Sequence, residues 1–208
     1  MIAKQPRGDR ESEFEFSCSE DYLESVRLRD GSLITLRLVG PSDKELLRRG
    51  FERLSQRSKY QRFFAAKRTL SEQDLAYLTQ MDGVNHLAIG ALRQLPDGSF
   101  EGLVIGRFVR CQGAPDSAEA AVAVIDEWQT KGIGTVLLMR LAAAARERGI
   151  EYFTAQVQRT NQAVQALLAR VPEAVIKPFD AETLQIRVKL PSSLSNPASP
   201  ERPPDSDL

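Results

Sequence analysis

Residues 118–148 read A-E-A-A-V-A-V-I-D-E-W-Q-T-K-G-I-G-T-V-L-L-M-R-L-A-A-A-A-R-E-R, a strand pattern, a glycine loop and a helix pattern in direct succession. The apolar run from Ala118 to Ile125 predicts a buried strand. From Gly134 to Arg148, apolar residues recur at helical spacing, and Gly149 then ends the helix. The first amides of a helix lack intrahelical acceptors and lie at the positive end of its dipole. This order therefore predicts an anion site.

The loop between that strand and that helix has two glycines, Gly132 and Gly134, which let a ligand approach the backbone without a Cβ in the way. A pyrophosphate suits such a place. The loop is not a Walker sequence, because G-x-x-x-x-G-K-[ST] is absent. It is also a poor dinucleotide fingerprint, because Leu137 stands where the third glycine belongs.

The composition excludes several classes of protein. The 208 residues include 28 Lys+Arg and 28 Asp+Glu, and this balance gives no reason to expect a nucleic-acid or membrane-surface partner. No apolar run has the length of a membrane span, and the first residues lack an apolar signal core, so we expect a cytoplasmic protein. One histidine and two separated cysteines, Cys18 and Cys111, predict no metal site.

We expect one folded domain at 22–190, between a flexible arm at 1–21 and a disordered Pro/Ser-rich tail at 191–208. Ser42 and Glu45 predict a capping box for the first helix, and 111–117 is expected to be a loop. The fold class is α/β, a single mixed, largely antiparallel sheet flanked by helices. The expected strands are 25–29, 33–39, 86–95, 102–110, 118–125, 152–157, 174–176 and 184–190, and the expected helices are 42–54, 55–64, 71–80, 134–148 and 161–171.

Two features allow more than one interpretation. Residues 44–68 carry nine basic and two acidic side chains, which could form a positive rim for an anionic ligand or a solvated helix face. The solvated face is favoured, because charge runs on helices usually face water. His86 could relay a proton, but a strand-start histidine with a hydrogen-bonded ring is preferred.

The central loop resembles motif A of the GNAT superfamily of acyl-CoA-dependent N-acyltransferases, Q/R-x-x-G-x-G/A after a β-strand. Gln129, Gly132 and Gly134 occupy its fixed positions. The strand Y-F-T-A-Q-V-Q, followed by Asn161 and a helix, is similar to motif B. The segments D-G-S-L-I-T-L-R, R-L-S-Q-R-S-K-Y-Q-R-F-F and L-S-E-Q-D-L-A-Y-L-T-Q-M-D look like the acetyltransferase domain of bacterial protein-lysine acetyltransferases.

The resemblance implies a GNAT-type domain that binds acetyl-CoA as acyl donor. The strand residues that would separate from the next strand and hydrogen-bond the pantetheine arm are Val122, Ala123 and Val124. The loop amides that would cradle the pyrophosphate belong to Thr130, Lys131, Gly132, Ile133, Gly134 and Thr135. Asn161 would touch the cofactor near its bend.

A general base is needed because a lysine amine, with an ordinary pKa of about 10.4, is protonated at neutral pH. Glu119 is the candidate: it stands among small apolar residues and shares a strand face with Ala121 and Ala123. The A-E-x-x-x-x-x-I arrangement resembles histone and bacterial protein acetyltransferases, in which a glutamate on this strand is the base. A strand-end glutamate that simply faces water is the competing interpretation.

The chain departs from many superfamily members at the general acid. Their tyrosine, seven residues after the motif B asparagine, is replaced by Leu168. We therefore assign no acid, since a thiolate can leave without one. The resemblance implies acetyl transfer to a primary amine, with a protein lysine as the first choice of acceptor, by a monomer or homodimer. A small-molecule amine acetyltransferase and a non-catalytic acyl-CoA-binding regulatory module are the alternatives.

Overall fold

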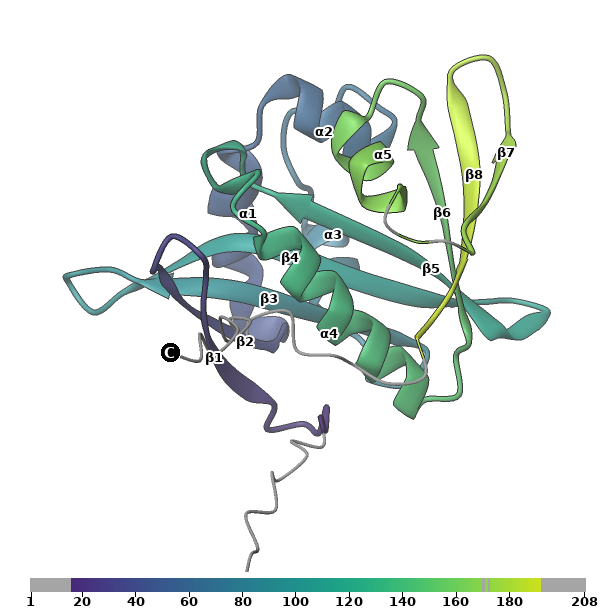
Figure 1. The fold of residues 1–208 in the computed structure, drawn as a ribbon. Helices are drawn as coiled ribbons and strands as arrows, with labels where there is room; N and C mark the ends of the chain where they lie inside the picture. Colours follow the sequence, from purple (N-terminus) through teal and green to yellow (C-terminus); the bar gives the residue numbers. More distant parts are fainter. Residues whose placement is uncertain (1–15, 170, 172, 192–208) are drawn as a thin grey trace, which may run out of the picture.

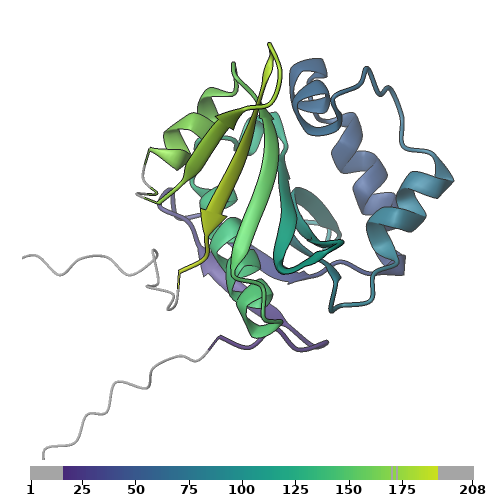
Figure 2. The same cartoon turned by 90° about the vertical axis from the view of Figure 1, so that its right-hand side faces the viewer.

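The computed structural model describes residues 16–169, 171 and 173–191, and these form an α/β domain around one sheet. The sheet has eight strands in the order β1-β2-β3-β4-β5-β6-β8-β7, and β5 and β6 are its parallel neighbours. Helices α1, α2 and α3 cover one face, and α4 and α5 lie on the other (Figures 1 and 2). The predicted fold class, a mixed and largely antiparallel sheet flanked by helices, is confirmed.

The elements follow the predicted order. The strands are β1 (Leu23–Arg27), β2 (Leu33–Leu38), β3 (His86–Gln94), β4 (Phe100–Cys111), β5 (Ala114–Val124), β6 (Tyr152–Gln158), β7 (Val175–Pro178) and β8 (Thr183–Lys189). The helices are α1 (Lys44–Glu52), α2 (Gln56–Phe63), α3 (Glu72–Thr79), α4 (Ile133–Glu147) and α5 (Gln162–Leu168), with short 3-10 turns at Pro41–Asp43 and Asp126–Trp128.

The start of α1 differs from the prediction. The expected capping box of Ser42 and Glu45 is wrong, because the carboxylate that accepts the amide of Gly40 (2.8 Å) belongs to Asp43. Asp43 is buried and also pairs with Arg37. The helix is therefore tied to β2 through a long-range ion pair, which a local capping pattern does not predict.

The β4–β5 connection is also tighter than expected. Residues 111–117 were predicted to be a loop, but Cys111 pairs with Ala114 and leaves a two-residue turn at Gln112 and Gly113. Gly113 has φ +77°, which glycine adopts without strain. The two strands are therefore longer than predicted and project as a hairpin beyond the rest of the sheet (Figure 1).

The domain begins before residue 22. Cys18 is buried in the core, and its amide and carbonyl bond to Glu147 and Arg148 at the end of α4 (3.1 and 3.0 Å). Burial raises the pKa of the Cys18 thiol to about 11. The described end of the predicted flexible arm is therefore packed, while residues 1–15 and 192–208 of the predicted arm and tail lie outside the described residues.

Helix α4 packs closely on β4 because Gly106 leaves room for it. A Cβ added at Gly106 would lie 2.9 Å from Cδ2 of Leu137, which is fully buried on α4. The same position would approach Val122 on β5 at 3.5 Å. The distance between this helix and the sheet therefore depends on a position without a side chain.

We predict that Gly106→Ala lowers the free energy of unfolding by about 1–3 kcal/mol, because overpacking forces Leu137 from its place. Gly102→Ala is the matched control on the same strand, since its nearest contact would be an ordinary 3.7 Å from the Leu46 carbonyl. That control should change the free energy by about 0.5 kcal/mol or less. Urea unfolding measures both, and equal losses would contradict the role of Gly106.

Candidate active site

The site begins where β5 and β6 separate. Their parallel pairing covers only Ser117 with Tyr152, Ala118 with Phe153 and Glu119 with Thr154. The amide of Ile125 donates to Leu103 on β4 (3.0 Å). Strand alternation then turns the peptide groups of Val122 and Val124 toward the open side. Ala123 differs from these two, since its peptide groups face β4.

The loop after β5 presents a row of free amides. In the part of the chain that the structure describes, the amides of residues 130–134 donate no hydrogen bond of normal geometry, whereas Thr135 donates to Gly132 (3.1 Å). Gly132 and Thr130 both have positive φ, +85° and +64°. A left-handed β-branched residue is strained, and such strain is common at ligand sites. Together with the start of α4, these amides suit a phosphate group.

The loop is held from both sides. Asp126 accepts bonds from the amide and hydroxyl of Ser55 (2.8 and 2.7 Å), which caps α2. Gln129 donates to the carbonyl of Val124 (3.2 Å) and to Ser58 (3.1 Å). Its side chain thus occupies the last carbonyl of β5 and leaves the Val124 amide on the open edge.

Trp128 lies beneath this loop. Its ring is 4% exposed and lies below the ammonium of Lys131, 4.6 Å from the ring centroid. Lys131 also pairs with Asp30 in the β1–β2 turn (3.5 Å). Asn161 stands across the opening at the start of α5, where its Oδ1 accepts the amide of Val164 (3.2 Å) and caps the helix.

A cavity of about 260 Å³ lies on the face of β5 that points away from α4, beneath α2 and α3. Glu119 and Ala121 line it from β5, and Arg107 and Val109 line it from β4. Register places Glu119 opposite Val109 and Arg107 opposite Ala121, so these side chains share one face of the sheet. Arg62, Phe63, Asp74, Tyr77 and Leu78 complete the lining.

The surroundings of Glu119 differ from the apolar setting that the sequence suggested. Its side chain is exposed and lines the cavity together with Arg62 and Arg107. Burial and the charge of Arg107 lower the pKa of Arg62 to about 10, partly offset by the negative charge of Glu119. The carboxylate is thus accessible and lies in a field set by two guanidinium groups.

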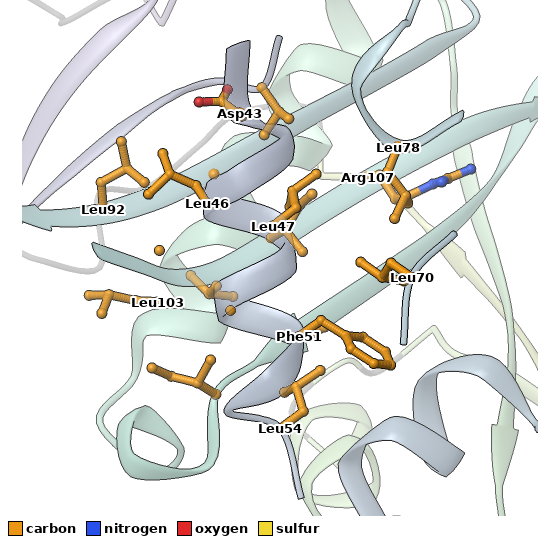
Figure 3. A pocket seen from close by; sticks show the side chains of 18 of the residues that line it. Asp43, Leu46, Leu47, Phe51, Leu54, Leu70, Leu78, Leu92, Leu103 and Arg107 are labelled. Carbon is orange, nitrogen blue, oxygen red and sulfur yellow. The ribbon is translucent and has the colours of Figure 1, made fainter. Parts of the chain in front are cut away.

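A second, apolar cavity of about 90 Å³ continues under α1 (Figure 3). Leucine side chains from α1 and the sheet line it, and it also contacts Ala123 on β5. Arg107 lies at its boundary with the first cavity, and its guanidinium points away from α1 (Figure 3). A strand edge, a loop of free amides and a carboxylate in a cavity therefore meet around β5.

Comparison with known proteins places this arrangement in a family. Residues 44–171 match the acetyltransferase (GNAT) family. The chain belongs to this family. The match includes α1 to α5, β5 and the 129–135 loop, so the motif A resemblance of Gln129, Gly132 and Gly134 is part of a family-wide similarity.

Two relatives within the GNAT family carry the name Pat or PAT. The GNAT domain of S. lividans PAT is 32% identical, with a TM-score of 0.71 over 81% of this chain and 97% of that one. Acetyltransferase Pat of Mycolicibacterium smegmatis is 28% identical over 85% of this chain and 51% of that protein. The chain thus spans about half the length of Pat.

The GNAT fold also relates the chain to yncA from Salmonella typhimurium, whose structure contains its cofactor acetyl-CoA. That protein is 16% identical, with a TM-score of 0.60 over 78% of this chain and 96% of that one. The likeness is one of fold.

The structure corrects the interpretation of the basic segment in this GNAT domain. The solvated helix face holds for exposed members such as Arg49 and Arg57 but not for two others. Lys59 is 7% exposed with its ammonium 4.7 Å from the Phe51 ring centroid, and Arg62 lines the cavity. Arg107 was not predicted as a site residue at all. The surrounding sequence G-R-F-V-R has no motif that marks it. Strand alternation does not mark it either, because helices cover both faces of β4.

His86 also differs from expectation. Its Nε2 is buried and has no hydrogen-bond partner among the described residues, so the predicted hydrogen-bonded ring is not present at that atom. The ring instead lies 5.2 Å from that of Tyr77. Within the same described range, no group of three or more His, Cys, Asp or Glu side chains could hold a metal ion, and no helix is long and apolar enough to cross a membrane.

We predict that the His86 imidazole titrates near pH 4. Burial and the positive charge of Arg107 lower its pKa from 6.5 to about 4. The folded state therefore binds this proton less tightly than the unfolded state, and the stability contributed by neutral His86 is complete above pH 6.5 and is lost toward pH 4. As the sole histidine, its ring resonance in an NMR titration reads this directly. A midpoint between pH 6 and 7 would contradict the prediction.

Proposed function

We propose that the chain transfers an acetyl group from acetyl-CoA to an amine, with Glu119 as general base. One observation supports this above all: the open edge of β5 connects the free amides of residues 130–134 with the cavity of Glu119. An acyl-CoA has a diphosphate toward one end and a thioester at the other. The free amides suit the diphosphate, and the cavity of Glu119 suits the reacting thioester. In GNAT proteins this strand and loop form the cofactor site.

The donor site follows from the backbone. The outward peptide groups of Val122 and Val124 match the amides of a pantetheine arm, and Ala123 contributes a small side chain on the cavity face. The loop from Gln129 to Thr135 would hold the diphosphate. Gln129 bonds the Val124 carbonyl and not the Val124 amide. That amide faces the open edge and is available to polarise the thioester carbonyl. Asn161 would lie near the bend of the cofactor.

The transfer moves the acetyl group from sulfur to nitrogen and removes two protons from the acceptor ammonium. Glu119 takes one proton from the ammonium, directly or through water, and the freed lone pair attacks the carbonyl carbon. A C–N bond forms, the C–S bond breaks, and the sulfur leaves as a thiolate. The nitrogen loses its second proton as it becomes an amide, the thiolate takes up this proton, and Glu119 releases the first proton to solvent. Residue Leu168 provides no acid in place of the usual tyrosine.

The acceptor that we propose is a lysine of another protein. The segment around Ser55–Phe64, which resembles the acetyltransferase domain of bacterial protein-lysine acetyltransferases, supports it. We expect the protein to act in the cytoplasm as a monomer or homodimer. A small amine acceptor stays the second candidate, because the 260 Å³ cavity can hold one.

We predict that Glu119→Gln lowers kcat by about 10²–10⁴-fold, the usual contribution of a general base, while acetyl-CoA affinity is retained. The substitution keeps the shape and removes the proton acceptor. Glu151→Gln is the control, an exposed glutamate at the start of β6. An endpoint acetylation assay measures turnover, and calorimetry measures acetyl-CoA binding. Full turnover in Glu119→Gln would sink the assignment, and tight binding without transfer to any amine would favour a non-catalytic acyl-CoA-binding module.

We predict that Gly132→Glu weakens acetyl-CoA binding by about tenfold or more. The carboxylate would repel a diphosphate, and the residue must adopt φ +85°. Gly113→Glu is the control with the same backbone strain, since Gly113 has φ +77° in the distant β4–β5 turn. Calorimetry on the two variants separates an effect at the loop from the general effect of a strained glutamate. Unchanged affinity in Gly132→Glu would rule out this loop as the diphosphate site.

A further inference from the structure

Two arginines in the Glu119 cavity lack the partners that other inward-facing arginines have. Arg107 is 7% exposed, and its guanidinium lies 4.3 Å from the Tyr77 ring centroid. Neither Arg107 nor Arg62 forms an ion pair or side-chain hydrogen bond with any residue that the structure describes. By contrast, Glu24 binds Arg140 through two contacts of 2.7 and 2.8 Å.

The carboxylates near this pair do not neutralise it. Asp74 lines the cavity but binds Lys67 (2.7 Å) and Ser71, and these bonds lower its pKa to about 2. His86, behind Tyr77, is neutral at pH 7 because its pKa is lowered to about 4. Glu119 is the remaining acid in the lining, so two guanidinium charges face one carboxylate.

A buried guanidinium without a counter-ion costs free energy, and two adjacent ones repel. The low pKa of Arg62, about 10, has its causes in this burial and in Arg107. A guanidinium fork binds a carboxylate through two parallel hydrogen bonds. The Tyr77 ring packs against the Arg107 guanidinium and leaves it without a hydrogen-bond acceptor. The cavity thus offers an anion what the protein itself does not supply.

The position of the pair relates it to the acceptor. Arg107 lies directly opposite Ala121, between Glu119 and Ala123 along the same face. Directly opposed side chains in an antiparallel pair have Cβ atoms about 4.5–5.5 Å apart. An anion on Arg107 would therefore lie a few bonds from an amine whose proton goes to Glu119.

We propose that Arg62 and Arg107 form an anion subsite of the acceptor cavity, which selects amines that carry a carboxylate a few bonds from the nitrogen. This rests on the proposed acetyl transfer and names its substrate class. The carboxylate could belong to a small amino acid or to an acidic side chain beside a lysine in a peptide. The chemistry at the guanidinium groups is the same for both.

The test compares acceptors that differ only in charge. One arm uses β-alanine and β-alaninamide, and the other uses a lysine peptide with Asp or Asn beside the lysine. The acid should exceed its amide in kcat/KM by about 30-fold or more in at least one arm, as expected for a desolvated charge pair. The arm that shows the preference identifies the source.

The variants assign the preference to the arginines. Arg107→Met and Arg62→Met should abolish or reduce it through KM, and Arg107→Lys should keep part of it because the charge remains. Arg68→Met is the matched control, an exposed arginine between α2 and α3. Thermal melting checks that each variant folds, and if Arg107→Met does not, Arg62→Met and Arg107→Lys carry the comparison.

The outcomes separate this proposal from the proposed function. Equal transfer to acid and amide in both arms would overturn the subsite and leave acetyl transfer intact. A preference for succinyl-CoA over acetyl-CoA on a neutral amine would also overturn it, because the arginines would then bind the acyl donor and not the acceptor. If no amine is acetylated, the protein is titrated with propionate at pH 7 and the His86 ring resonance is followed by NMR. A saturable shift that Arg107→Met removes supports the subsite, and the absence of a saturable shift overturns it.

Discussion

The separation of β5 from β6 after three residue pairs is the constraint from which the site follows. Parallel strands cannot be joined by a tight turn, so the chain must cross over, and α4 is that crossover. The helix therefore begins at the end of β5, beside the opening. A free strand edge and a helix start with free amides then occur at one place because the topology requires both.

The alternation of β5 divides its residues between three surroundings. Val122 and Val124 direct their side chains to the sheet face that α4 covers, where they lie beside Gly106 on β4 and Gly134 on α4, respectively. Glu119, Ala121 and Ala123 direct theirs into the cavities under α1 to α3. The peptide groups of the even-numbered residues face the opening. A shift of one residue in register would exchange all three surroundings, so the close fit of α4 on Gly106 also fixes the position of Glu119.

The sequence predicted most elements because their signals are local. Ser55 and Ser71 cap α2 and α3, and Gly149 ends α4, as their positions indicate. Other features depend on contacts between distant residues and could not be predicted. The carboxylate of Asp43, just before α1, accepts the Gly40 amide and pairs with Arg37 on β2. The inward direction of Arg62 depends on how α2 sits over the sheet.

The candidate site divides along the same line. The glycine loop and the Glu119 strand have sequence patterns. The structure shows the loop at the end of β5 and Glu119 farther back on the same strand, facing a cavity. Arg107 has no such pattern. Alternation marks an arginine as outward-facing only where one sheet face meets water, and β4 has helices on both faces.

Several unfavourable features of the described residues lie around the same opening. Thr130 adopts a left-handed backbone, Arg62 and Arg107 repel each other, and the Nε2 atom of His86 is buried without a partner among the described residues. Inward-facing charges elsewhere in the described chain, such as Arg140 and Asp43, are paired. Selection for stability alone would remove such costs as readily here as elsewhere. Their positions, Thr130 in the loop and the arginines in the Glu119 cavity, argue that they persist for binding, because bound anions would supply contacts that the folded chain leaves unmade.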